Sequence, residues 1–190
     1  MIAKGSIILL VILIIVSTIT IPNLLKDLQN VGITENCDLN KLESDKIFKK
    51  CDFSDLDLSY KNLTRTHFVQ SNFQNANLEG SNLSYAVLDG INFDGANLEN
   101  VNLQGALLQS AIFTNANLKN SDLSNSYATN ADFSHANLEN VNFYKSRISG
   151  TDWTNANLIG ADFTEVALTD LSGFDHSNWK DCDGFFMCTK

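Results

Sequence analysis

The chain has 190 residues, which is enough for one domain with a short appendage, and 44% of them are hydrophobic, which is enough for a packed core. One proline, 18% charged residues and twelve phenylalanines are not typical of a disordered chain or of an ordinary helical or α/β enzyme domain. The formal net charge of −9 argues against a basic nucleic-acid-binding surface, although it leaves an acidic mimic of DNA open.

The N-terminal residues 1–25 contain a long apolar segment. Ten consecutive large aliphatic residues run from Ile7 to Val16, and the apolar character continues to Ile21 before Pro22. A helix of about 20 apolar residues spans a bilayer, but a core of about 10 to 14 is also used by signal peptides. Because no small-x-small cleavage site follows, we predict an uncleaved membrane anchor; a cleaved signal peptide and a buried core helix are the alternatives. The predicted anchor residues include Ile7, Leu10, Leu13, Val16 and Ile19.

The charges that flank this segment indicate its orientation. Lys4 and the amino terminus precede it, whereas Lys26 and Asp27 cancel each other after it. The positive-inside rule therefore favours a cytoplasmic N-terminus, with the remaining chain in the periplasm, the thylakoid lumen or another extracytoplasmic space. The four cysteines agree with export, because disulfides persist mainly outside the cytosol.

Residues 26–50 are predicted to be a linker and an N-terminal cap. The charged stretch from Asp38 to Lys50 includes Ile47 and Phe48, and we expect it to form a short helix over the start of the next domain. A disulfide between Cys37 and Cys51 would pin this cap in place. Free buried thiols and a metal site are the alternatives, although the cysteine spacing expected for zinc is absent.

A five-residue repeat occupies residues 51–170. This stretch divides without insertion or deletion into 24 units, such as ANLEG at Ala76 and ADFTE at Ala161. The third residue, the centre of the unit, is Leu or Phe in 21 of the 24 units, and the exceptions are Ala128, Ile148 and Trp153. The first residue is mostly small and the second is mostly Asn or Asp. This pattern predicts a repeat architecture in which the centres are buried.

A longer period underlies the first one. Every fourth centre carries a similar residue, as in the column Leu58, Leu78, Leu98, Leu118, Leu138 and Leu158. A period of 20 residues means four units per turn. Stacked turns about 4.8 Å apart place like side chains above like, so six turns predict a rod of roughly 29 Å.

These units resemble those of the pentapeptide-repeat family, whose consensus is written A(D/N)LXX. The resemblance covers 120 of the 190 residues in one register. It implies an all-β fold, a right-handed quadrilateral β-helix of about six coils, to which the sequence adds an N-terminal transmembrane helix and short end caps. Lumenal members of this family occur in photosynthetic organisms, and some other members protect DNA gyrase from quinolones by imitating duplex DNA.

Residues 171–190 depart from the repeat and are predicted to form a C-terminal cap. Phe174, Trp179, Phe185 and Phe186 are expected to cover the last coil, because an open solenoid end would otherwise expose unpaired backbone. Cys182 and Cys188 are expected to close a small loop by a second disulfide.

No residues suggest catalysis or cofactor binding. The sequence contains no nucleophile elbow, P-loop, HExxH motif or dinucleotide fingerprint. The register puts His67 and His135 on different faces. Glu79, Glu99 and Glu139 form one outward line interrupted by Lys119. A solvated acidic face is the expected interpretation, and an acidic strip that faces a partner is the alternative. We therefore predict a protein that is not an enzyme and that has no cofactor, metal, small-molecule substrate or nucleic-acid ligand.

A departure from the consensus indicates a candidate interaction face. In the fourth column the second residues, which are polar elsewhere, are His67, Val87, Leu107, Tyr127, Arg147 and Ala167, and Ile112 of the neighbouring column has the same role. Apolar residues gathered on one side of a rod suggest contact with a protein or a membrane. Cover by the chain's own terminal segments, or mere tolerance of apolar residues, would explain the pattern equally well.

The sequence therefore predicts a membrane-anchored extracytoplasmic scaffold or accessory subunit of a membrane complex. In this hypothesis the N-terminal helix fixes the chain in the membrane, and Val87, Leu107, Tyr127, Arg147 and Ile112 contact another membrane or extracytoplasmic protein. The alternatives are a free periplasmic or thylakoid-lumen protein and an acidic DNA mimic that protects a topoisomerase.

Overall fold

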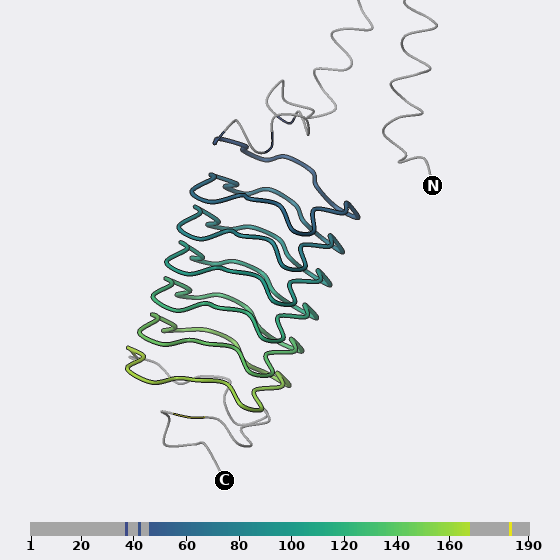
Figure 1. Cartoon of the computed structure of the whole chain (residues 1–190). Helices are drawn as coiled ribbons and strands as arrows, with labels where there is room; N and C mark the ends of the chain where they lie inside the picture. Colours follow the sequence, from purple (N-terminus) through teal and green to yellow (C-terminus); the bar gives the residue numbers. More distant parts are fainter. Residues whose placement is uncertain (1–36, 38–41, 43–45, 168–182, 184–190) are drawn as a thin grey trace, which may run out of the picture. The chain divides into compact units, whose positions relative to one another are not determined.

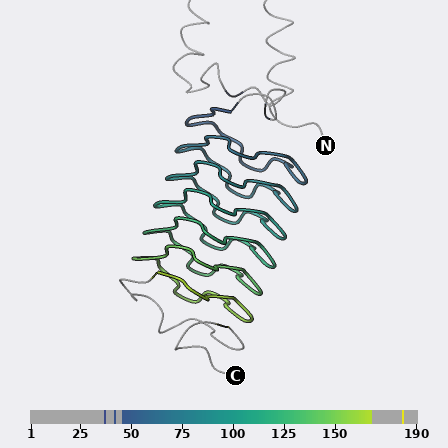
Figure 2. The same ribbon diagram turned by 60° about the vertical axis from the view of Figure 1, so that its left-hand side comes forward.

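The computed structural model describes residues 37, 42, 46–167 and 183, all of which belong to one compact unit, Glu35–Lys190. Residues 46–167 wind as a solenoid of stacked coils (Figures 1 and 2). Bridges between residues 20 apart show that four five-residue units complete each coil. Residues 46–167 form no helix and no extended strand; each side contributes an isolated parallel bridge at the second residue of its unit. The β-helix expected from the repeat is confirmed.

The register of the solenoid follows the 20-residue period. Between residues 47 and 167 every bridge joins residues 20 apart, as in Asn77 to Asn97 and Asn97 to Asn117. From Phe48 to Phe143, each centre N–H donates to the second-position carbonyl of the next coil, for example Leu98 N to Asn117 O at 2.7 Å. Paired main-chain groups therefore connect every coil to its neighbours, as buried backbone requires.

Each corner is a turn that needs a left-handed residue. The N–H of a first residue donates to the preceding centre carbonyl, as Ala96 N does to Phe93 O at 3.0 Å. The fifth residue of each of the 24 units from Lys50 to Glu165 has positive φ, and 14 of them are Asn or Gly. Asn and Gly tolerate this region best, which explains their place in the repeat. Gly80 also leaves room for the ring of Tyr60 in the coil above, 2.6 Å from where a Cβ would lie.

The core consists of the centre residues and the small first residues. One centre column is a continuous aromatic stack from Phe53 to Trp153, with neighbouring ring centroids 4.8 to 5.4 Å apart. The centres from Phe48 to Phe163 are all buried. Burying a Leu or Phe side chain contributes about 1.5 to 3 kcal/mol, so this core is the main source of stability.

The repeat begins earlier than its consensus indicated. Residues 46–50, assigned above to a capping helix, form another repeat unit: Ile47 bridges His67, Phe48 is fully buried and Lys50 has positive φ. The expectation of a helix is therefore wrong for these five residues. The ring of Phe48 stacks on Phe68 at 5.4 Å, which makes this unit a covering layer for the first complete coil.

At the C-terminal end, the backbone bridges also continue beyond the last complete coil. Asp183, in the segment expected to cap the last coil, bridges Asp162, and its N–H donates to Ala161 O at 2.9 Å. Phe163 N donates in turn to Asp183 O at 2.8 Å. Asp183 therefore pairs with the backbone of the last coil as a second-position residue would.

Candidate functional site: an apolar strip on one face

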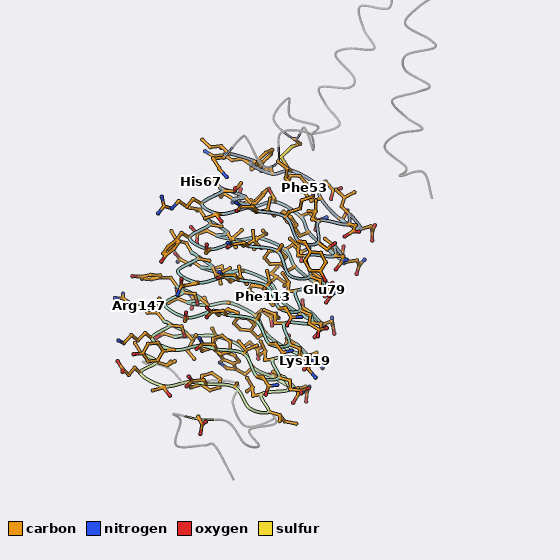
Figure 3. All side chains as sticks on the ribbon, in the orientation of Figure 1. Phe53, His67, Glu79, Phe113, Lys119 and Arg147 are labelled. Atoms are coloured by element: carbon orange, nitrogen blue, oxygen red, sulfur yellow. A yellow bond between two sulfur atoms is a disulfide. The ribbon has the colours of Figure 1, made fainter. Side chains whose placement is uncertain are left out.

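The four faces are numbered by the units that follow Lys50. The first face has its centres from Phe53 to Trp153, the second from Leu58 to Leu158, the third from Leu63 to Phe163, and the fourth from Phe48 to Ile148. The second and fourth faces lie on opposite sides of the coil: Figure 3 shows Glu79 and Lys119 on one edge and His67 and Arg147 on the other.

The fourth face carries four of the five predicted interaction residues in one row. Parallel bridges join consecutive members, so the backbone holds each residue directly beside the next. The row, called here the contact strip, consists of Ile47, His67, Val87, Leu107, Tyr127, Arg147 and Ala167. Ile47 was not among the predicted residues, although KIFKK at Lys46 continues the register with an apolar centre.

Several members of the strip are open to solvent. Ile47 is 50% exposed, Tyr127 43% and Leu107 38%, whereas Val87 is half-buried. Ile112, on the adjoining first face, is 40% exposed. Large apolar side chains that gather on one exposed side of a protein are typical of a binding site. Within the described part of the chain, these four side chains remain open to solvent.

Local contacts shape the C-terminal half of the strip. The guanidinium carbon of Arg147 lies 4.9 Å from the ring centroid of Tyr127, a cation–π contact. An apolar second residue cannot accept a hydrogen bond from the N–H two residues later, as Asn and Asp do elsewhere. After Leu107, the N–H of Gln109 instead donates to a carboxylate of the preceding coil, Asp89 Oδ1, at 3.1 Å.

The opposite second face differs because its second-position side chains form a ladder. The amide Nδ2 of each asparagine donates to Oδ1 of the residue one coil earlier at 3.0 to 3.3 Å, beginning with Asn77 on Asp57. Each Oδ1 also accepts from a backbone N–H, such as Lys119 N on Asn117 at 3.3 Å. The polar groups of this face therefore satisfy one another.

The predicted acidic line lies on the second face and is partly neutralised. Lys119 Nζ lies 2.9 Å from Glu139 Oε1, and Tyr60 donates its hydroxyl to Glu79 Oε1 at 3.0 Å. This hydrogen bond and the nearby carboxylate charge raise the pKa of Tyr60. Glu139 likewise raises the pKa of Lys119. Surface pairs of this kind contribute little, so the line is a solvated face.

The described part of the solenoid contains no candidate metal site. Its residues include no group of three or more His, Cys, Asp or Glu that would hold a metal ion. His67 and His135 lie on the fourth face and at the corner that ends the first. The contact strip is the arrangement most suited to function, and what it can do is bind.

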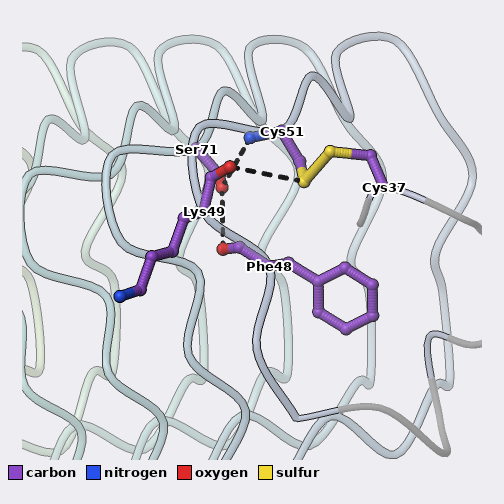
Figure 4. The surroundings of a disulfide bond; sticks show 5 residues. All are labelled: Cys37, Phe48, Lys49, Cys51 and Ser71. Carbon is purple, nitrogen blue, oxygen red and sulfur yellow. Dashed lines mark hydrogen bonds between the residues drawn. A yellow bond between two sulfur atoms is a disulfide. The ribbon is translucent and has the colours of Figure 1, made fainter. Parts of the chain in front are cut away.

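The predicted N-terminal cysteine pair is joined in the structure. Cys37 and Cys51 form a disulfide with a Cα–Cα distance of 5.6 Å (Figure 4). Cys51 is buried, and its N–H donates to Ser71 Oγ at 3.1 Å, while that hydroxyl donates to Phe48 O at 3.3 Å. The disulfide therefore attaches the upstream segment to the core. Cys182 and Cys188 lie outside the described residues.

The predicted membrane anchor also lies outside the described residues, since these begin at Cys37. Among the residues that the structure describes, no helix is long and apolar enough to cross a bilayer.

Fold and register together define a four-sided β-helical solenoid built from five-residue units. A family profile described as "Pentapeptide repeat region" matches residues 27–103 and 96–173. These matches span most of the chain, which therefore belongs to the pentapeptide-repeat family. Among curated proteins, no match to the sequence was found.

Solved structures of the same family resemble the solenoid. The pentapeptide repeat protein Rfr23 from the cyanobacterium Cyanothece 51142 aligns with a TM-score of 0.58 and 22% identity, over 69% of this chain and 97% of that one. A pentapeptide repeat protein of the Arabidopsis thaliana thylakoid lumen aligns at 0.39 with 28% identity, over 62% and 72%. QnrB1, a plasmid-mediated fluoroquinolone resistance protein, aligns at 0.37 with 19% identity, over 72% and 83%. The likeness to Rfr23 supports the fold.

Proposed function

We propose that this protein is a non-catalytic scaffold or accessory subunit that binds another protein through its contact strip. The observation that carries the proposal is the exposure of Ile47, Leu107 and Tyr127 in one row of a rigid solenoid. A surface with apolar and aromatic side chains supplies the desolvated centre that a protein interface needs.

The N-terminal segment supports a cellular location for the protein. An apolar run from Ile7 to Ile21 would anchor the chain in a membrane, with the solenoid in the periplasm, the thylakoid lumen or another extracytoplasmic space. The Cys37–Cys51 disulfide supports an oxidising compartment. It would also shorten the tether between the anchor and the solenoid, because it ties Cys37 directly to the buried Cys51.

Mimicry of duplex DNA fits the solenoid less well. Such a mimic needs a continuous negative surface, because duplex DNA carries one charge per about 1.7 Å of its axis. The contact strip instead presents Leu107, Tyr127 and the cation of Arg147 along one whole side.

The test is purification of the native full-length protein from membranes in mild detergent. An intact mass that retains Met1, lacks four hydrogens for two disulfides and accompanies a stoichiometric partner would support the anchored-subunit proposal. The partner should be lost from a Leu107→Glu variant and kept by Tyr60→Phe, which changes a corner residue outside the strip. A mature N-terminus beyond Thr20 with no partner would make the protein a free exported solenoid.

A further inference from the structure

The distribution of charge around the solenoid points to the kind of surface that the contact strip binds. Among the described residues, the fourth face (46–50, 66–70, 86–90, 106–110, 126–130, 146–150 and 166–167) has four Lys or Arg and one Asp. The other three faces, which make up the rest of 51–165, have four Lys or Arg and twelve Asp or Glu. The fourth face is therefore the cationic side of an otherwise acidic protein.

The cations of the fourth face stand at both ends of the strip. Lys46, Lys49 and Lys50 lie beside Ile47 at the N-terminal end, and Arg147 lies beside Tyr127 near the other end. Arg65 and Lys145, at the corner before this face, add positive charge at the same two ends, although Lys145 pairs with Glu165 at 3.4 Å.

Within the described part of the chain, most of the cations on the fourth face itself have no carboxylate partner. No carboxylate in the described part of the chain forms an ion pair with Lys49, Lys50 or Arg147. The one carboxylate on the face, Asp89, already accepts a hydrogen bond from the backbone of Gln109. Between the two charged ends, Val87, Leu107 and Tyr127 form the apolar centre.

We propose that the contact strip binds a protein surface on which an apolar patch is flanked by carboxylates. This inference rests on the proposed function and specifies the chemistry of the partner. Opposite charges at the two ends of the strip would steer the encounter and fix its register, while the apolar centre supplies the buried contact.

Two other occupants match the strip less well. An anionic bilayer would attract the strip but repel the twelve carboxylates on the other three faces of the same narrow solenoid. The fourth face of a second copy carries the same cations and would be repelled. The acidic second face of another copy is the nearest competitor, and the mass of a covalent adduct distinguishes it.

The test uses the full-length chain in its native membrane with a photoreactive benzoylphenylalanine in place of Leu107. The matched control places the same residue at Tyr60, an exposed aromatic position outside the strip. Adducts to a protein are expected from position 107 and not from position 60. Their yield should fall about tenfold in an added Arg147→Glu variant and severalfold when the salt rises from about 0.05 to 0.5 M, because screening weakens exposed charge pairs.

Two further variants separate charge from structure. Lys119→Glu makes the same change in charge on the opposite face, where the adduct yield should change less than about twofold. Arg147→Gln keeps much of the shape of the side chain and should give an intermediate yield. Unchanged thermal unfolding of these variants would establish that the solenoid is intact.

The outcomes distinguish the proposed function, which is binding of a protein by the contact strip, from the further inference that this protein is acidic around its apolar patch. Absence of any protein adduct from position 107 in the folded chain would overturn the proposed function itself. A protein adduct whose yield ignores Arg147→Glu and salt would leave the proposed function standing and refute the acidic partner. An adduct to lipid, or one with twice the mass of the chain, would refute a partner protein of this kind.

Discussion

The second and fourth faces are built on the same backbone and use their outward positions in opposite ways. On the second face, asparagine side chains bond from coil to coil. On the fourth face, the same positions hold Val87, Leu107 and Tyr127, yet the main-chain bonds are equally short: Leu88 N to Leu107 O and Leu98 N to Asn117 O are both 2.7 Å. The side-chain ladder is therefore not needed to close the coil, and one face is free to bind.

The largest expected effect comes from the core that both faces share. Leu118→Ala removes a fully buried centre between Leu98 and Leu138, and we expect it to lower the free energy of unfolding by about 2 to 5 kcal/mol. Leu107→Ala makes the same chemical change on the contact strip and should cost less than about 1 kcal/mol, because Leu107 is partly solvated already. Denaturant unfolding of the full-length protein measures both, and equal losses would contradict the division between core and strip.

The next effect compares the outward positions directly. Asn117→Ala removes a ladder residue that donates to Asn97, accepts from Asn137 Nδ2 at 3.0 Å and accepts from Lys119 N, so a loss of about 1 to 2 kcal/mol is expected. Tyr127→Ala removes only an exposed ring and its cation–π contact with Arg147, worth about 0.5 to 1 kcal/mol. Thermal unfolding ranks the two variants; a greater loss from Tyr127→Ala would show that the strip is structural.

A smaller effect should come from converting one apolar position to the ladder type. On the first face, Ile112 interrupts the row of second-position Asn and Asp residues, between Asn92 and Asp132. In Ile112→Asn, the new amide has a potential acceptor on Asn92 and the new Oδ1 can accept from Thr114 N, so the free energy of unfolding should rise by about 0.5 to 1.5 kcal/mol. Ile112→Ala, which lacks the amide, serves as the control. A destabilised Ile112→Asn protein would show that the isoleucine is needed for packing.

The smallest effect is acid sensitivity of the polar faces. The hydroxyl of Ser54 donates to Asp52 Oδ1 at 2.7 Å and, with help from the Ser54 N–H and Asn72, lowers the pKa of Asp52. A carboxyl whose pKa is lower in the folded state stabilises that state above its ordinary pKa, near 3.8, and this contribution is lost as the pH falls through the folded pKa.

Replacing this carboxylate tests its contribution. The difference in unfolding free energy between pH 7 and pH 3 should be smaller in Asp52→Asn than in the unchanged protein. An equal difference in the two proteins would mean that Asp52 does not contribute to acid sensitivity. Chemical denaturation at the two pH values gives the comparison, provided both proteins unfold reversibly.

Much of the solenoid was predictable because its contacts are periodic. A residue packs against those 20 positions away, so a repeat read along the chain is also a list of neighbours in space. The predicted centres from Phe53 to Phe163, including the unusual residues Ala128, Ile148 and Trp153, are all buried. The same 20-residue period predicted that the residues of the contact strip from His67 to Ala167 lie in one row.

The first unit was missed for a physical reason. Lys46 stands where the repeat has a small inward residue and Ile47 where it has Asn or Asp, so KIFKK did not match the consensus. At the end of the solenoid Lys46 is exposed, and its Nζ donates to Thr64 O at 3.2 Å. The consensus describes coils with neighbours on both sides, whereas an end unit has fewer restrictions.

The sequence by itself determined which residues of each unit face inward and that four units complete a turn, because burial of the centres demands both. Only the tertiary structure decided which outward residues interact. Asn82 and Asn102 on the third face occupy the same position as Asn97 and Asn117 on the second, yet only the second pair is joined by a side-chain hydrogen bond within the described solenoid. Such contacts depend on the rotamers and exact spacing of adjacent coils, as do the exposure of Leu107 and the placement of Arg147 over Tyr127. Residue type and period do not specify these distances.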